Sequence, residues 1–414
     1  APGTTERPVA QCIGALSGVV RLDRLEDLIL DLHRRGFASE ELRLRAAYAL
    51  ERASKGDEEI SLEVCRLLES WLQDESAGDA EPMSGAGSEH DDGTEALLFG
   101  WRAFGTLPRG NYPFLSALTT AYLLRATPLI DHWMDVLERH LERNEVPAVW
   151  SALAHQLQNV VLAPADRAEW FLDRLFARYP CVRDSEPGMA LIACAMAQVA
   201  PSAIERWLTA LEQGGWLRAS QGFGELLVLL ASRPDAPRWA QERLETELAA
   251  VGGPSANDSL LLGLTHAAAH LWGEPERREV ASRVLLRVLP VAAGPFADAL
   301  MDAFRCVDCL PWDEPTKAIL EGLVAHPELL VRGGSRMLVD RLDDLLPGQA
   351  ALVAEVTSAL ISEAERAAPQ SLQLVQDPML VDIAMTLQRL GPPYREQGLN
   401  LFEALQYHGV ESEL

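Results

Sequence analysis

Proline and tryptophan recur at a nearly fixed offset through the middle of the chain. The prolines stand 36, 37 and 33 residues apart, at positions 128, 164, 201 and 234. A tryptophan follows each of them by five or six positions, at Trp133, Trp170, Trp207 and Trp239. Proline is tolerated in the first turn of a helix, where its missing N–H would have no partner. Because helical-hairpin repeats have a period of this size, the register predicts stacked hairpins whose tryptophans fill the repeat core.

Helical spacing of apolar residues extends far beyond this register. Leu25, Leu28, Ile29 and Leu32 lie on one helical face, and no convincing run alternates as a strand would. Chain breakers fall every fifteen to twenty residues, which is typical of short helices joined by tight turns. We therefore predict an all-α fold, an α-solenoid of stacked helical hairpins similar to HEAT or TPR repeats.

One segment departs from the helical pattern. Residues 74–95 contain eight acidic residues, several Gly and Ser, and no Lys or Arg. This composition indicates a flexible acidic linker or a surface loop. The predicted organisation is an N-terminal helical unit at 1–73, this linker at 74–95, and the solenoid at 96–414.

Charge and cysteine content exclude several classes of protein. The formal charge of -25 opposes binding to nucleic acid, because that affinity comes largely from Lys and Arg neutralising phosphates. No uncharged run is apolar enough to span a membrane, and the N-terminus is too amphipathic for a signal peptide. Six scattered cysteines suit a reducing compartment. We expect a cytoplasmic protein that binds neither nucleic acid nor membrane.

No catalytic motif stands out. The chain lacks the P-loop, the nucleophile elbow, the His-Glu-x-x-His zinc motif and the dinucleotide fingerprint. Cys306 and Cys309 form a lone Cys-x-x-Cys without a second ligand pair, and His266 and His270 lie in an apolar helix as core histidines do. We therefore expect no enzyme activity, no cofactor and no metal.

Two turn-like segments are the candidates for contact with a partner. Arg109, Asn111 and Tyr112 lie in a bend between prolines that we expect to be exposed, and Phe223 and Glu225 begin an apolar helix within Gly-Phe-Gly-Glu. Connections on a rigid scaffold often carry function. Both segments also have ordinary structural uses, as a turn and as a helix entry.

Four phrases in the sequence resemble a known family. They are LPRGNYPFLSALTTAYLL, WMDVLERHLERN, QGFGELLVLL and VDIAMTLQRLGPPYREQGLNLFEAL. In this order they look like the carboxy-terminal helical region of bacterial STAND or NACHT ATPases, several of which act in phage defence, over about residues 95–408. The resemblance implies a sensor or autoinhibitory array. The nucleotide-binding module of that family is missing from this sequence, so neither ATP nor catalytic residues carry over.

Three functions remain open at this point. The first is a non-catalytic scaffold or sensor that binds another protein, such as an ATPase or a protease encoded nearby. The second is a regulatory protein or protease substrate that is switched by cleavage within 74–95. The third is an enzyme with an unrecognised helical active site.

Overall fold

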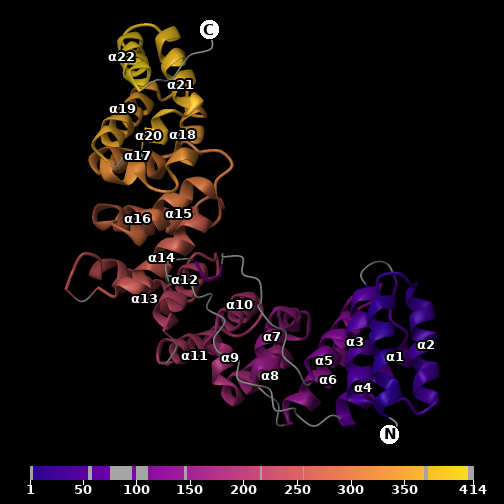
Figure 1. The fold of residues 1–414 in the computed structure, drawn as a ribbon. Coiled ribbons are helices and arrows are strands. Elements are labelled where there is room, and N and C mark those ends of the chain that lie inside the picture. The colour runs from indigo at the N-terminus through magenta and orange to yellow at the C-terminus, as the bar shows by residue number, and fades with distance from the viewer. Residues whose placement is uncertain are drawn as a thin grey trace. The chain divides into compact units, whose positions relative to one another are not determined.

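The protein is all-α. The structure, a computed structural model, describes residues 3–54, 58–74, 96–98, 111–143, 147–214, 217–254, 256–367 and 372–408, and these residues form helices and turns without a strand (Figure 1). This confirms the predicted all-α fold. The helical spacing of apolar residues is the cause: in α2 (Leu22–Arg34), for example, Leu22, Leu25 and Ile29 are the buried residues.

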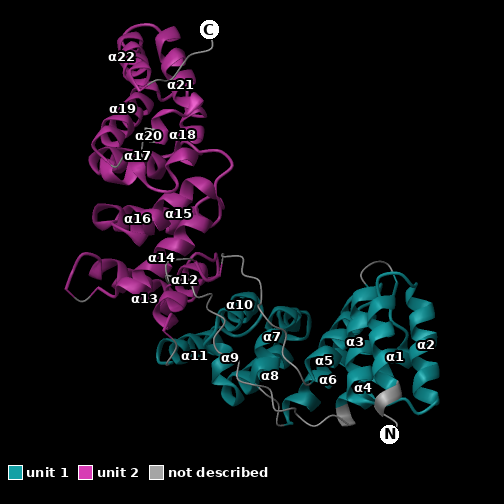
Figure 2. Cartoon of the chain, in the orientation of Figure 1, with its two compact units in different colours: residues 1–89, 102–216 teal, residues 90–101, 217–414 magenta. Residues whose placement is uncertain are grey.

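The chain divides into two compact units, drawn in different colours in Figure 2. Unit 1 comprises residues 1–89 and 102–216, and unit 2 comprises residues 90–101 and 217–414. The division therefore falls at 216/217, and a short stretch before residue 102 belongs to unit 2. Of the predicted acidic linker, all but Asp74 lies outside the described residues.

Unit 1 contains eleven helices within its described residues. They are α1 (Gly3–Leu16), α2, α3 (Glu40–Ala53), α4 (Leu62–Asp74), α5 (Tyr112–Leu123), α6 (Ile130–Leu141), α7 (Pro147–Leu157), α8 (Ala165–Arg178), α9 (Pro180–Arg183), α10 (Glu186–Ala195) and α11 (Pro201–Glu212). The helices α1, α3, α5, α7 and α10 pack one on the next in a single row. The other long helices form the outer members of the hairpins, so each hairpin covers the apolar face of its neighbour.

Unit 2 repeats this arrangement. Its described helices are α12 (Ala219–Ala231), α13 (Arg238–Ala250), α14 (Asp258–Leu271), α15 (Arg278–Val288), α16 (Pro295–Arg305), α17 (Glu314–Ala325), α18 (Ser335–Asp343), α19 (Ala350–Arg366), α20 (Leu372–Val375), α21 (Pro378–Arg389) and α22 (Tyr394–Tyr407). One row runs through α12, α14, α16, α18 and α21, and a second runs through α15, α17, α19 and α22. Short 3₁₀ segments lie between consecutive helices, at Gln158–Leu162 in unit 1 and at Leu289–Val291 and Pro327–Val331 in unit 2.

The proline and tryptophan register marks the second helix of successive hairpins. Helices α6, α8, α11 and α13 each begin shortly after one of the four prolines. Only Pro201 stands within the first turn; Pro164 is the N-cap residue of α8, and Pro128 and Pro234 precede their helices by a few residues. Proline therefore stands just before three of these helices and inside the first turn of the fourth, two positions that its fixed backbone suits.

Long polar side chains link these second helices. Arg167 on α8 reaches Asp131, Asp135 and Glu138 on α6. One repeat later, Arg206 on α11 pairs with Glu169 and Asp173 on α8. Arg and acidic residues therefore join neighbouring second helices. Among the described helices, none is long and apolar enough to cross a membrane.

Candidate functional site

The four register tryptophans lie in different environments. Trp133 is fully buried and its indole N–H donates to Thr119 Oγ1 at 3.0 Å. Trp207 is also buried and donates to Asp173 Oδ1 at 2.6 Å. Trp239 is partly buried, whereas Trp170 is 41% exposed and lies under the guanidinium of Arg174. Trp170 therefore differs from the expected core position.

The predicted bend at 109–112 does not project into solvent in its described part. Asn111 is the N-cap residue of α5, and Asn111 and Tyr112 are 2% and 7% exposed. The expectation of an exposed bend is therefore wrong for these two residues. Helix α5 contacts α3, α4, α6 and α7, so neighbours cover its first turn as well as its middle. Arg109 lies outside the described residues.

Phe223 and Glu225 are buried as well, on α12 of unit 2. Phe223 lies 5.4 Å below the guanidinium of Arg243 on α13. Glu225 is completely buried, and its carboxylate accepts hydrogen bonds from the backbone N–H groups of Leu97 and Leu98 at 2.8 and 2.7 Å. The acidic residue therefore binds a segment of main chain 128 positions earlier in the sequence.

A polar chain along α12 supports this carboxylate. Arg218 donates to Gln221 Oε1 at 3.1 and 3.0 Å, and Gln221 Nε2 donates to Glu225 Oε1 at 3.2 Å. Burial raises the pKa of Glu225 to about 7, although the hydrogen bonds from residues 97, 98 and 221 and the charge of Arg218 favour its ionised form. Desolvation therefore outweighs the contacts that the carboxylate makes. We call Gln221, Glu225 and the bound residues 96–98 the Glu225 site.

A close helix crossing fixes the position of the Glu225 site. A Cβ atom at Gly224 would lie 2.4 Å from the carbonyl oxygen of Leu260, and one at Gly263 would lie 2.0 Å from the carbonyl oxygen of Gln221. Such distances are far below van der Waals contact, so α12 and α14 pack directly through their backbones. The sequence phrase QGFGE therefore combines two roles, since its second glycine allows the crossing and its last residue binds the segment.

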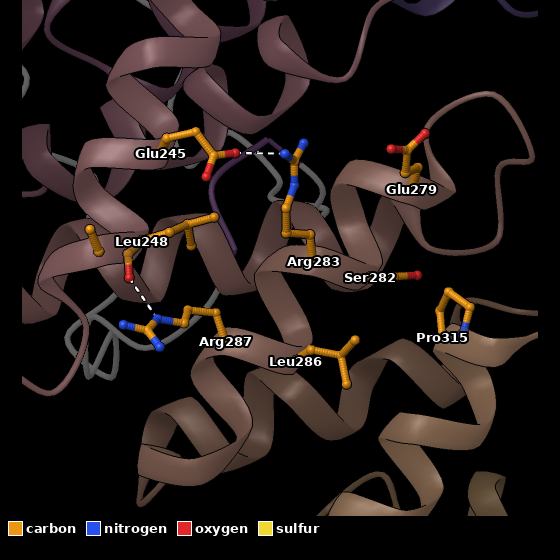
Figure 3. A pocket seen from close by; sticks show the side chains of 9 residues that line it. Glu245, Leu248, Glu279, Ser282, Arg283, Leu286, Arg287 and Pro315 are labelled. Atoms are coloured by element: carbon orange, nitrogen blue, oxygen red, sulfur yellow. Dashed lines mark hydrogen bonds and ion pairs between the residues drawn. The ribbon is translucent and has the colours of Figure 1, made fainter.

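A second candidate site is an open groove on the second helices of unit 2. It has a volume of about 550 Å³ and lies between α13, α15 and the start of α17 (Figure 3). Leu248, Leu286 and Pro315 supply apolar surface, and Glu245 and Arg283 form an ion pair of 2.6 Å along one side. Arg287 donates to the carbonyl oxygen of Leu248 at 2.9 Å, near the C-terminus of α13. We call this the Arg283 groove.

Unit 1 carries an equivalent groove between α4 and α6, with a volume of about 240 Å³. Arg139 pairs with Glu69 at 3.1 Å, as Arg283 does with Glu245. Arg143 donates to the carbonyl oxygen of Leu72 at 3.0 Å, as Arg287 does to Leu248. In both grooves the arginines are four positions apart and their partners are three positions apart.

This repeated pair of arginines was missed in the sequence, although its spacing was visible there. An arginine that binds the last carbonyl oxygens of a helix is favoured by the helix dipole. The grooves lie between second helices that these arginines link, whereas the first helices α12 and α14 pack through glycine.

The cysteines and histidines singled out in the sequence do not converge on a site. Cys306 is partly buried and Cys309 is exposed, just after α16. The ring of His270 contacts the carbonyl oxygen of His266 through Nδ1 at 2.9 Å, which is a contact within one helix. Within the described residues no group of three or more His, Cys, Asp or Glu side chains is arranged to hold a metal ion.

Taken together, these features define an all-α protein of two helical units, each with a groove on its second helices that combines apolar surface with paired charges. The chain matches no known protein family, no curated protein and no solved structure at a significant level.

Proposed function

We propose that the protein is a non-catalytic, cytoplasmic scaffold or sensor with an α-solenoid architecture, and that it binds another protein through the Arg283 groove. One observation carries this proposal. The groove presents the aliphatic surface of Leu286 and Pro315 beside charges that are already paired, such as Glu245 with Arg283.

This combination suits a protein partner. Contact regions of protein interfaces are apolar at the centre and polar at the rim, and arginine is enriched in them. Arg283 is exposed and can exchange its bond to Glu245 for one to a partner, since an exposed ion pair contributes little to stability. The net charge of -25 further favours a partner with a basic surface.

Pull-down with two matched variants tests the proposal. Leu286→Glu places a charge in the groove, and Leu399→Glu places one on α22, where Leu399 is 42% exposed. We expect the same partner to be recovered with the unchanged protein and with Leu399→Glu, and to be lost with Leu286→Glu. Recovery of identical proteins with all three, or of none with any, contradicts a binding role for the groove. Circular dichroism of each variant controls for folding.

The sequence resemblance adds a context to this proposal. We propose that the scaffold is the regulatory part of a bacterial defence system, and that the partner is an ATPase or a protease encoded nearby. Co-expression of the neighbouring coding sequences with this chain tests the idea. A complex that survives size-exclusion chromatography supports it, and separate elution of every neighbour contradicts it.

A further inference from the structure

The Glu225 site differs from an ordinary buried contact. It holds a short segment by two consecutive main-chain N–H groups, and its own side of the contact is a row of polar side chains on α12. Ala96 and Leu97 are 8% and 5% exposed, so the apolar side chains of the bound segment are buried as well. These are the elements of a peptide-binding site.

The geometry points to a second binding site: α12 binds a bent peptide segment through Glu225, and Ala96–Leu98 occupies this site as a displaceable ligand within the same chain. The partner that fits has a segment that bends so that two consecutive N–H groups point the same way, and it carries aliphatic side chains there. This site is separate from the Arg283 groove, and either can fail without the other.

Three observations support displacement. The binding side is rigid, because Gly224 and Gly263 fix α12 against α14 without room for a Cβ atom. The bound side belongs to unit 2, although the stretches on either side of it, residues 1–89 and 102–216, belong to unit 1. The carboxylate of Glu225 is completely buried, and the cost of its desolvation offsets part of what its hydrogen bonds contribute to stability. The carboxylate does, however, select for peptide that offers those N–H groups.

The internal segment 96–98 and an added peptide would compete for the Glu225 site on unequal terms, because the internal segment is part of the same chain. A segment within the same chain has an effective concentration in the millimolar range, so an added peptide competes poorly until the internal segment is weakened. Replacing Leu97 and Leu98 by proline removes both N–H groups and leaves the carboxylate in place. The vacated full-length chain should then accept peptide from solution.

The test uses a fluorescent peptide with the sequence of residues 94–99, TEALLF. We expect the Leu97→Pro, Leu98→Pro chain to bind it at least tenfold more tightly than the unchanged protein. A peptide with N-methyl groups at the two positions equivalent to Leu97 and Leu98 should not bind, and adding Glu225→Gln should reduce the affinity at least tenfold. Glu276→Gln, at an exposed glutamate of unit 2, should leave it unchanged.

Absence of binding to the vacated chain, or equal binding of the N-methylated peptide, overturns the inference. Hydrogen exchange of the unchanged protein provides an independent measurement if the proline variant fails to fold. We expect the amides of Leu97 and Leu98 to exchange at least tenfold faster than the central amides of α12 and α14, because the segment opens locally. Exchange of both only through global unfolding shows a fixed structural contact and also overturns the inference.

Discussion

Arg287 donates a hydrogen bond to the carbonyl oxygen of Leu248, which lies 39 positions earlier and close to the end of α13. Arg143 makes the same bond to Leu72 near the end of α4 in the other unit. The same contact is therefore made in both units near the end of a helix, where the last carbonyl groups lack the partners of an interior turn. It also places an arginine at the edge of each groove.

Replacing Arg287 by methionine should lower the free energy of unfolding. Methionine keeps much of the aliphatic packing but removes the charged donor from the C-terminus of α13, at a cost of about 1 kcal/mol. Urea unfolding, monitored by circular dichroism, measures this difference in the free energy of unfolding. Arg238→Met is the matched control, because Arg238 is 90% exposed and pairs only within its own helix with Glu242. Equal effects of the two variants would show that the bond to Leu248 has no special role.

Adding a methyl group at Gly224 should strongly destabilise unit 2. The new Cβ atom would lie 2.4 Å from the Leu260 carbonyl oxygen, and backbone cannot move aside as a side chain does. The expected loss is at least about 2 kcal/mol, despite the better helix propensity of alanine. A Cβ atom at Gly333 meets nothing within 4 Å, so Gly333→Ala should change the unfolding midpoint little. An unchanged midpoint for Gly224→Ala would disprove the close crossing.

Stability should depend on pH through Glu225. Its pKa is about 7 in the folded protein and near 4.5 when unfolded, so the folded state holds the extra proton between these values. The contribution to stability is therefore complete below about pH 4.5 and is lost as pH rises through 7, by roughly 3 kcal/mol in total.

The comparison with Glu225→Gln isolates this effect from other titrating groups. We expect the unchanged protein to lose stability relative to Glu225→Gln between pH 4.5 and pH 8, as measured by urea unfolding at each pH. A constant difference between the two proteins over this range would mean that Glu225 does not titrate there.

The cysteines should differ sharply in reactivity. Cys65 is fully buried on α4, and burial raises the pKa of its thiol to about 12, whereas Cys309 is exposed. Since the thiolate is the reactive form, a thiol reagent at pH 8 should modify Cys309 quickly and Cys65 only after unfolding. Peptide mapping of the labelled protein distinguishes the two. Rapid modification of Cys65 in the folded protein would contradict its position in the core.

The sequence contained enough to predict the fold class because helical spacing is local. Each helix shows its buried face within about four residues, as Leu25 and Ile29 do in α2. The register of proline and tryptophan likewise located four helices, from the one with Trp133 to the one with Trp239. The structure shows that they are the second helices of their hairpins. Exposure was harder to predict, since Trp170 and Trp207 share the register but differ in what covers them.

The candidate site could be predicted only in part. Phe223 and Glu225 were singled out from the sequence, but their burial depends on α13 and on residues 96–98, which lie far away along the chain. Tyr112 was expected to be exposed because prolines flank it, yet the neighbours of α5 cover it. Contacts with residues far away along the chain leave no pattern in the nearby sequence from which burial could be predicted. The paired arginines of the grooves did leave one, at a spacing of four.

The central claim is that the Arg283 groove binds another protein, and site-specific photo-crosslinking tests it most directly. A photoreactive amino acid at position 286 in the groove is compared with one at position 399 on α22, in cells that express the full chain. We predict a crosslink to a single protein species from position 286, absent from position 399 and lost when Arg283→Glu is added. Crosslinks that are the same from both positions, or that persist with Arg283→Glu, would contradict the account.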